Sequence, residues 1–227
     1  MDSSFFIKPD RNITVQDFNL IIQESKTGCV GEHFDYAWKI LKENFLAYFL
    51  CAFVVSSVSI AINKIIPILG FFLTPSITYG LMIIVKKYQT LENYTISNYS
   101  DFVTQIIDGV SLQYKKIITL GITLLTYYFF VGVGTIFLII PGIYAYFALS
   151  LADKIVFDKN CDFDVALRVS HTMFKQHFGF FVLFYLSLLG INFLGVCFFG
   201  VGVFITMPLT CLMTISLYYK LFSCNPI

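Results

Sequence analysis

One part of the sequence gathers side chains that could bind a metal ion. The group consists of Cys161, Asp162, Asp164, His171 and His177. An α-helix completes a turn in about 3.6 residues, so the spacing of the two histidines places their imidazoles on different faces of one helix. No second pair of ligands has the spacing of a known zinc site. The pattern therefore favours polar residues at a membrane interface over a metal centre.

The sequence contains none of the common catalytic motifs. It has no H-E-x-x-H, no G-x-S-x-G and no glycine-lysine loop that could hold phosphate. The long apolar stretches carry neutral polar side chains, whereas ion-coupled carriers normally bury charged ones near mid-membrane. We therefore predict that the protein is not an enzyme and that it uses no cofactor and no metal.

Two residues inside the apolar stretches could form a polar layer. We aligned the chain with itself so that Phe45 is matched with Phe178, and we call this the repeat alignment. In it, Ser59 is matched with Asn192. Hydroxyl and amide groups in membrane helices mostly join neighbouring helices. We favour that interpretation, and a substrate path is the alternative.

Three prolines recur at a nearly constant spacing within the apolar stretches. Pro75, Pro141 and Pro208 each end a Phe-x-x-x-Pro sequence. A proline inside a helix removes one backbone hydrogen bond and kinks the helix. We expect each proline one or two turns inside the second helix of a hairpin. Packing of the kinked helices is the favoured explanation, and a shared polar pocket is the alternative.

The elements that must position these residues are indicated by the composition. The chain is 57% apolar and 13% charged, with a mean hydropathy of +0.78, whereas soluble domains are about 45–50% apolar and about 25% charged. Lys64 is the only Lys, Arg, Asp or Glu in residues 44–85, 117–152 and 176–219. A crossing needs about 20 apolar residues, so each stretch is long enough for two. We therefore predict an all-α, polytopic membrane protein with six transmembrane helices in three hairpins.

The distribution of basic residues predicts the orientation. If each stretch forms a hairpin, fourteen of the fifteen Lys and Arg residues lie on the side of the two termini, and only Lys64 lies at a hairpin tip. Basic residues concentrate on the cytoplasmic side of membranes. Both termini are therefore predicted to be cytoplasmic. Residues 1–35 mix charges with short apolar stretches, which predicts no cleavable signal peptide.

An internal repeat divides the predicted transmembrane domain, residues 31–222, into three units. The units cover about residues 34–88, 101–154 and 163–221, between tails at 1–30 and 223–227. Each unit is predicted to begin with an amphipathic helix along the cytoplasmic interface, followed by two crossings. The repeat alignment matches the first and third units without a gap and pairs Lys42 with Lys175. The outer turns are expected at 63–67, 131–134 and 199–202. A rival placement of the middle turn at Pro141-Gly142 would leave the next crossing too short.

Part of the sequence resembles an uncharacterised group of bacterial polytopic inner-membrane proteins. The motif comprises Ile-Pro-Gly-Ile-Tyr at 140–144, an acidic spacer at 158–164, Ala-Leu-x-x-Ser at 166–170 and Phe-Gly at 178–179. The group includes YciC-like proteins and the membrane domain associated with some glycerophosphodiester phosphodiesterases. The resemblance covers about residues 36–222. It implies an inner-membrane location and a part in envelope maintenance or transport.

These observations together predict a non-enzymatic integral inner-membrane protein. We expect a role in envelope or lipid homeostasis, or as a membrane assembly partner, and a small transporter or channel is the alternative. Amphipathic helices that carry aromatic and basic residues attract anionic lipids. Membrane lipids are therefore the expected partners, alongside a second copy of the chain or other membrane proteins, and no nucleic acid is expected.

Overall fold

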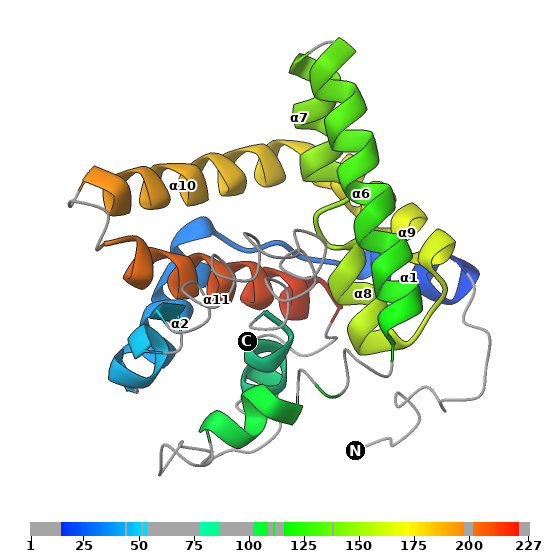
Figure 1. Cartoon of the computed structure of the whole chain (residues 1–227). Helices are drawn as coiled ribbons and strands as arrows, with labels where there is room; N and C mark the ends of the chain where they lie inside the picture. The colour runs from blue at the N-terminus through cyan, green and yellow to red at the C-terminus, as the bar shows by residue number, and fades with distance from the viewer. Residues whose placement is uncertain are drawn as a thin grey trace, which may run out of the picture. The chain divides into compact units, whose positions relative to one another are not determined.

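The computed structural model describes nine ranges of the chain: 15–43, 45–50, 52–53, 78–86, 102–108, 111, 116–137, 139–197 and 202–222. The described residues are mostly helical and contain no strand, as the all-α prediction requires. The labelled helices are α1 (Val15–Glu24), α2 (Val30–Glu43), α6 (Ile117–Phe137), α7 (Ile139–Ala148), α8 (Ala152–Lys159), α9 (Phe163–Gln176), α10 (Phe178–Cys197) and α11 (Val203–Phe222) (Figure 1). Shorter helical pieces lie at 45–50, 78–86 and 102–108.

Four segments of the described chain are long and apolar enough to cross a membrane. They are Ile118–Thr135, Ile140–Lys159, Phe178–Cys197 and Val203–Phe222. Large apolar side chains are exposed along two of them, for example Leu125 on α6 and Leu189 on α10, each 68% exposed. Apolar surface of this extent is what a lipid environment covers. The segments indicate a membrane protein. The first predicted hairpin lies mostly outside the described residues.

One compact unit comprises residues 1–25 and 116–182. Its α6 and α7 form a hairpin in which the two helices lie side by side (Figure 1). Gly134 and Gly142 bring the backbones together, because a Cβ placed on Gly134 would lie 2.8 Å from the backbone nitrogen of Gly142. Further along the same unit, α9 packs against both α7 and α8, and α1 packs against α9.

The tip of this hairpin corrects the predicted position of the middle turn. Residues 131–134 are helical and belong to α6, and Pro141-Gly142 belongs to α7, so both placements considered from the sequence are wrong. The helix α6 ends at Phe137, and α7 begins at Ile139. The glycines were interpreted as turn formers, but small residues in membrane helices also allow close helix packing. Here Gly134 and Gly142 perform that second role, whereas Gly132 has open space beside it.

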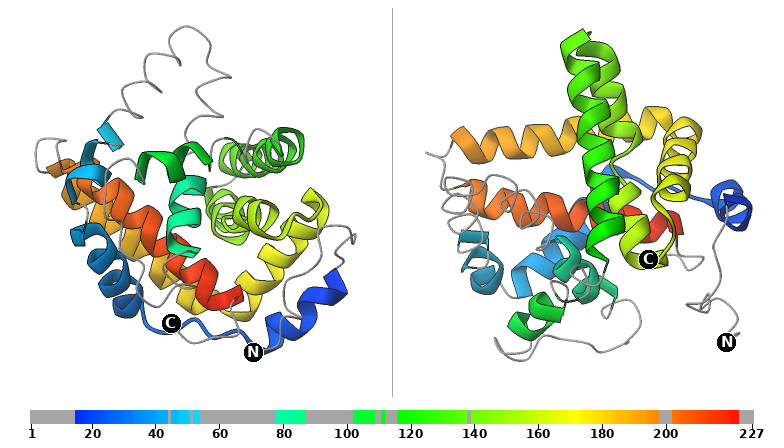
Figure 2. Two further views of the ribbon diagram at one scale, coloured as in Figure 1. Left: turned by 90° about the horizontal axis from the view of Figure 1, so that it is seen from below. Right: turned by 45° about the vertical axis from the view of Figure 1, so that its right-hand side comes forward.

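The other compact unit comprises residues 26–115 and 183–227. Within it α2 packs against α11, and the C-terminal part of α10 lies beside α11 (Figure 2). Gly195 and Gly202 are in close contact near the tip of this hairpin, where a Cβ on Gly202 would lie 2.9 Å from the Cα of Gly195. The turn predicted at 199–202 lies mostly outside the described residues.

Two amphipathic helices, α2 and α9, match each other in the repeat alignment. Each has 14 residues, and the alignment that pairs the first residue of α2 with the first of α9 also pairs their last residues. Four buried positions of α2 coincide with four buried positions of α9 in this alignment: His33, Ala37, Ile40 and Leu41 correspond to Ala166, Ser170, Met173 and Phe174. The two helices therefore bury the same face, each within its own unit.

Candidate functional site

The predicted kink positions occupy different places in the fold. Pro208 is the sixth residue of α11 and is buried, so it lies inside the second helix of its hairpin. Pro141 is the third residue of α7 and is exposed, instead of one or two turns inside the helix as predicted. The first turn of a helix has backbone N–H groups without intrahelical partners, so a proline there removes no bond. Pro75 lies outside the described residues.

The structure places one of the two residues of the predicted polar layer. Asn192 is half-buried on α10, and its Nδ2 donates to the carbonyl oxygen of Leu188 at 3.1 Å. Its amide therefore bonds within its own helix instead of joining two helices. Ser59 lies outside the described residues.

A polar site that the sequence did not predict lies where α7 ends and α8 begins. The two helices are separated by a turn at residues 149–151, inside the candidate crossing Ile140–Lys159. A break within a membrane frees backbone carbonyl and N–H groups, and these need partners because water is scarce there. The acidic and basic residues that end the middle apolar stretch, Asp153 and Lys154, were the sequence signal for this site.

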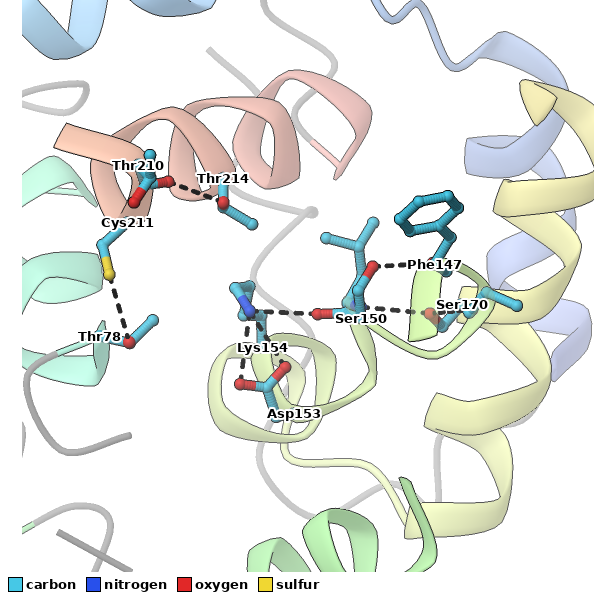
Figure 3. A network of polar contacts seen from close by, with 11 residues as sticks. Thr78, Phe147, Ser150, Asp153, Lys154, Ser170, Thr210, Cys211 and Thr214 are labelled. Carbon is cyan, nitrogen blue, oxygen red and sulfur yellow. Dashed lines mark hydrogen bonds and ion pairs between the residues drawn. The ribbon is translucent and has the colours of Figure 1, made fainter. Parts of the chain in front are cut away.

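Side chains bind three of the carbonyl oxygens at the break (Figure 3). The hydroxyl of Ser150 donates to the carbonyl of Phe147 at 2.8 Å, and the hydroxyl of Ser170 donates to that of Ala148 at 2.7 Å. The ammonium of Lys154 donates to the carbonyl of Ser150 at 3.2 Å. Ser170 is on α9, so the amphipathic helix itself supplies one of the groups that close the break.

Backbone groups complete the hydrogen bonding at the break. The N–H of Ala152 donates to the carbonyl of Leu149 at 3.1 Å, and the N–H of Ile155 donates to that of Leu151 at 3.0 Å. The N–H of Leu151 itself donates to the hydroxyl of Ser170 at 3.3 Å. All five carbonyls from residue 147 to 151 therefore accept a hydrogen bond, as buried backbone groups must.

The break also contains a buried ion pair. The Nζ of Lys154 lies 3.1 and 3.4 Å from the two carboxylate oxygens of Asp153. The side chains are only 9% and 16% exposed. A buried ammonium is tolerated when a carboxylate and further acceptors surround it. The pair lies just beyond the uncharged stretch 117–152 and within the candidate crossing Ile140–Lys159.

Side chains also hold the C-terminal end of α8. The Nζ of Lys116 donates to the carbonyl of Phe157 at 2.7 Å and lies 5.6 Å from the centre of its ring. The Sγ of Cys161 lies 4.0 Å from the carbonyl oxygen of Ile155. Burial raises the pKa of the Cys161 thiol to about 11, so this thiol is protonated at neutral pH. Both ends of α8 are therefore anchored within this unit.

His33 joins α2 to two other parts of its unit. Its Nε2 lies 2.7 Å from the carbonyl of Thr27, so Nε2 donates, and Nδ1 accepts from the hydroxyl of Ser216 at 2.9 Å. The ring also meets Phe184 edge-on, with centroids 5.7 Å apart. Burial lowers the pKa of His33, so the neutral ring is favoured.

The two remaining histidines have separate partners in the other unit. The Nε2 of His171 lies 2.9 Å from the hydroxyl of Tyr144, and the Nε2 of His177 lies 2.8 Å from that of Ser25. Ser25 donates its proton to the carbonyl of Ile22 at 2.7 Å, so His177 is the donor to Ser25. In the described ranges no three His, Cys, Asp or Glu side chains are grouped closely enough to hold a metal ion.

Comparison with known proteins adds no homology to this geometry. No family model matches the chain, and no curated protein or solved structure matches it. The resemblance to the YciC-like group therefore stays a hypothesis based on the motif. The motif residues lie in the first half of α7 (140–144), within α9 (166–170) and at the start of α10 (178–179). The function has to be inferred from the site and its elements.

Proposed function

We propose that the chain is a non-enzymatic integral protein of a bacterial inner membrane, which acts in lipid or envelope homeostasis or as a membrane assembly partner. In this proposal it crosses the membrane six times, in three hairpins, with both termini in the cytoplasm. The observation that carries the proposal is the matched pair of amphipathic helices, α2 and α9. Each of them directly precedes an apolar helical segment and exposes two basic residues, Lys39 and Lys42 on α2 and Arg168 and Lys175 on α9.

The partners of the two amphipathic helices support the three-hairpin organisation. The helix α9 contacts α7, the second helix of the middle hairpin, through the hydrogen bond from Ser170 to the carbonyl of Ala148. The helix α2 is bonded to α11, the second helix of the last hairpin, through His33 and Ser216. Each amphipathic helix thus packs on a second crossing that comes from a different repeat unit.

The remaining predicted amphipathic segment, which begins the middle unit, follows the same pattern. Residues 102–108 approach residues 78–86, which belong to the second predicted crossing of the first hairpin. A Cβ on Gly80 would lie 2.9 Å from the Cα of Ile106. The second and third amphipathic helices therefore each pack on the hairpin that precedes them in the sequence. The first amphipathic helix packs on the last hairpin. This cyclic pattern supports a threefold repeat.

A contact between equivalent positions also supports the repeat. The hydroxyl of Thr78 lies 4.0 Å from the Sγ of Cys211 (Figure 3). These two residues fall on each other in the repeat alignment of the first and third units. Equivalent faces of the two second crossings therefore meet, as expected for related helices around a local axis.

Topology reporters test the arrangement in the membrane. Fusions of a phosphatase and of a fluorescent reporter after Asn98 and after Asn160 should both report the cytoplasm, because both positions lie between hairpins. A third fusion at Lys64 should report the periplasm. A periplasmic signal from either asparagine contradicts the six-crossing topology, since an even number of crossings separates these positions from the N-terminus.

Purification with native lipid tests the lipid role. The protein extracted in polymer nanodiscs should carry a lipid population that differs from the bulk membrane, as measured by mass spectrometry. An unrelated six-helix protein prepared in the same way is the control. Identical lipid populations in the two preparations contradict a lipid-oriented role and leave the assembly-partner version to be tested by cross-linking.

A small transporter or channel is the second candidate, and the break between α7 and α8 favours it. Discontinuous helices and buried ion pairs mark the ion and substrate sites of many carriers. Proteoliposomes should then dissipate a proton, sodium or potassium gradient faster than protein-free vesicles. Replacement of Lys154 by Met should remove the additional flux. Equal leak rates with and without the protein contradict ion transport.

A further inference from the structure

Aromatic and basic side chains form a row along an accessible edge of α2. Phe34, Trp38 and Lys42 recur at every fourth position, which places them on one side of the helix. The rings of Phe34 and Trp38 are stacked with centroids 6.2 Å apart, and the Nζ of Lys42 lies 5.2 Å from the Trp38 ring. Leu41, on another side of the same helix, is fully buried. The row is therefore a separate, accessible edge.

An exposed apolar strip continues from this row. Phe45, Leu46, Leu50 and Phe53 are 42–54% exposed, while Ala47, Tyr48 and Ala52 between them are buried. Leu46, Leu50 and Phe53 follow Lys42 at intervals of four, four and three positions. The charge of Lys42 therefore stands at the head of an apolar strip. A phospholipid has the complementary shape, with a phosphate at the head of its acyl chains.

The same layout recurs at the junction of α9 and α10. In the repeat alignment, Trp38, Lys42 and Phe45 correspond to His171, Lys175 and Phe178. Lys175 is exposed, and Phe178 is 53% exposed. Two separate corners thus carry an exposed lysine beside an exposed phenylalanine.

We propose that each corner binds an anionic phospholipid, with the lysine at the headgroup phosphate and the exposed apolar side chains beside it along an acyl chain. This inference rests on the proposed membrane location and adds the lipid class. A lysine ammonium is a point charge that suits phosphate, and aromatic rings beside it suit the interfacial layer. A lysine near an anionic membrane surface favours binding by about fivefold. Each corner should therefore prefer phosphatidylglycerol to phosphatidylcholine by about that factor.

The single tryptophan of the chain makes the α2 corner directly measurable. Trp38 is the only Trp in the sequence, so its fluorescence reports this corner alone. The full chain is reconstituted in phosphatidylcholine bilayers that contain a small fraction of brominated phosphatidylglycerol or, separately, of brominated phosphatidylcholine. Bromine quenches tryptophan at short range. We expect about fivefold more effective quenching by the anionic lipid.

Two matched variants assign the preference to one side chain. Lys42→Gln should bring the quenching ratio of the two lipids close to one. Lys39→Gln removes the same charge from an exposed position next to Trp38 in the chain, and it should leave the ratio nearly unchanged. In the unaltered protein, about 1 M salt should lower the ratio, because it screens an exposed charge. This salt titration remains decisive if Lys42→Gln does not fold.

The outcomes separate the lipid site from the proposed function. A ratio near one in the unaltered protein, or an equal loss for Lys39→Gln and Lys42→Gln, overturns the anionic-lipid site and leaves membrane insertion intact. An absence of quenching by either lipid overturns the site together with the membrane location. The second corner is tested by moving the tryptophan, with Trp38→Phe and Phe178→Trp combined, and by adding Lys175→Gln.

Discussion

Replacement of Ser170 by Ala tests the break between α7 and α8. The Ser170 residue is 1% exposed, and its hydroxyl donates to the carbonyl of Ala148 at 2.7 Å and accepts from the N–H of Leu151 at 3.3 Å. Alanine keeps most of the buried contact and removes both bonds. One buried carbonyl and one buried N–H are then left without the partner that they have in the native protein.

The two lost bonds determine the expected loss of stability. An unsatisfied buried backbone group costs about 1–3 kcal/mol. The bond to Ala148 is short and the bond to Leu151 is long, so the second loss should fall near the lower limit. Ser170→Ala should therefore reduce the free energy of unfolding by about 3 kcal/mol. For a chain of this size that corresponds to a fall in Tm of about 6–12 °C.

Thermal unfolding and amide hydrogen exchange measure the two consequences. Tm is compared in one detergent, and exchange is followed by mass spectrometry in peptides that cover residues 147–156. The control is Ser187→Ala, because the Ser187 hydroxyl donates only within its own helix, to the carbonyl of Leu183 at 2.9 Å. The control should change the free energy of unfolding by less than about 0.5 kcal/mol. Ser170→Ala should also accelerate exchange at Leu151.

Equal stability of Ser170→Ala and the unaltered protein would refute this account of the break. The same is true if Tm falls but exchange at Leu151 does not change, because the loss would then arise elsewhere. Ala37 occupies the position of α2 that corresponds to Ser170 in the repeat alignment. The helix that it packs against, α11, has no break, so Ala37→Ser should bring no gain in stability.

Three further predictions concern packing, pH and thiol reactivity. Gly142→Ala should destabilise the protein by more than about 1 kcal/mol in thermal unfolding, because the Cβ of the new alanine would lie 2.7 Å from a backbone nitrogen of α6. Gly132→Ala is the control: a Cβ at this position has open space around it, so the variant should not be destabilised. Burial lowers the pKa of His33. The stabilising contribution of this histidine is therefore present above about pH 6.5 and is lost as pH falls through the lowered pKa. His33→Gln should reduce the slope of Tm against pH between about pH 7 and pH 5. In single-cysteine variants at about pH 7.5, a maleimide should label exposed Cys29 at least about tenfold faster than buried Cys161, whose pKa is raised to about 11, and equal rates contradict this.

The local pattern of the sequence was enough to predict an all-helical chain with long apolar helices. Long apolar stretches without charge predict helices that can cross a membrane, because the length of an apolar helix is set by the hydrocarbon thickness. The periodicity of α2 and α9 predicts that each is amphipathic, because a helix places residues three and four apart on one side. The repeat alignment, found from residue identities alone, likewise pairs both ends of these two helices.

Tertiary structure decided the role of individual residues within those helices. Gly132, Gly134 and Pro141 were interpreted from sequence as a turn and a kink, yet they lie within α6 and in the first turn of α7. Local sequence cannot distinguish a glycine that ends a helix from one that lets two helices meet, since the second role depends on the neighbouring backbone.

The pair Ala37 and Ser170 illustrates the same division most clearly. The two positions correspond in the repeat alignment, and both are buried. Only the packed structure explains why one is alanine and the other serine, because Ser170 faces the ends of α7 and α8, where Ala148 and Leu151 need hydrogen-bond partners. The residue type at a buried position depends on the polar groups around it, and those groups come from distant parts of the chain.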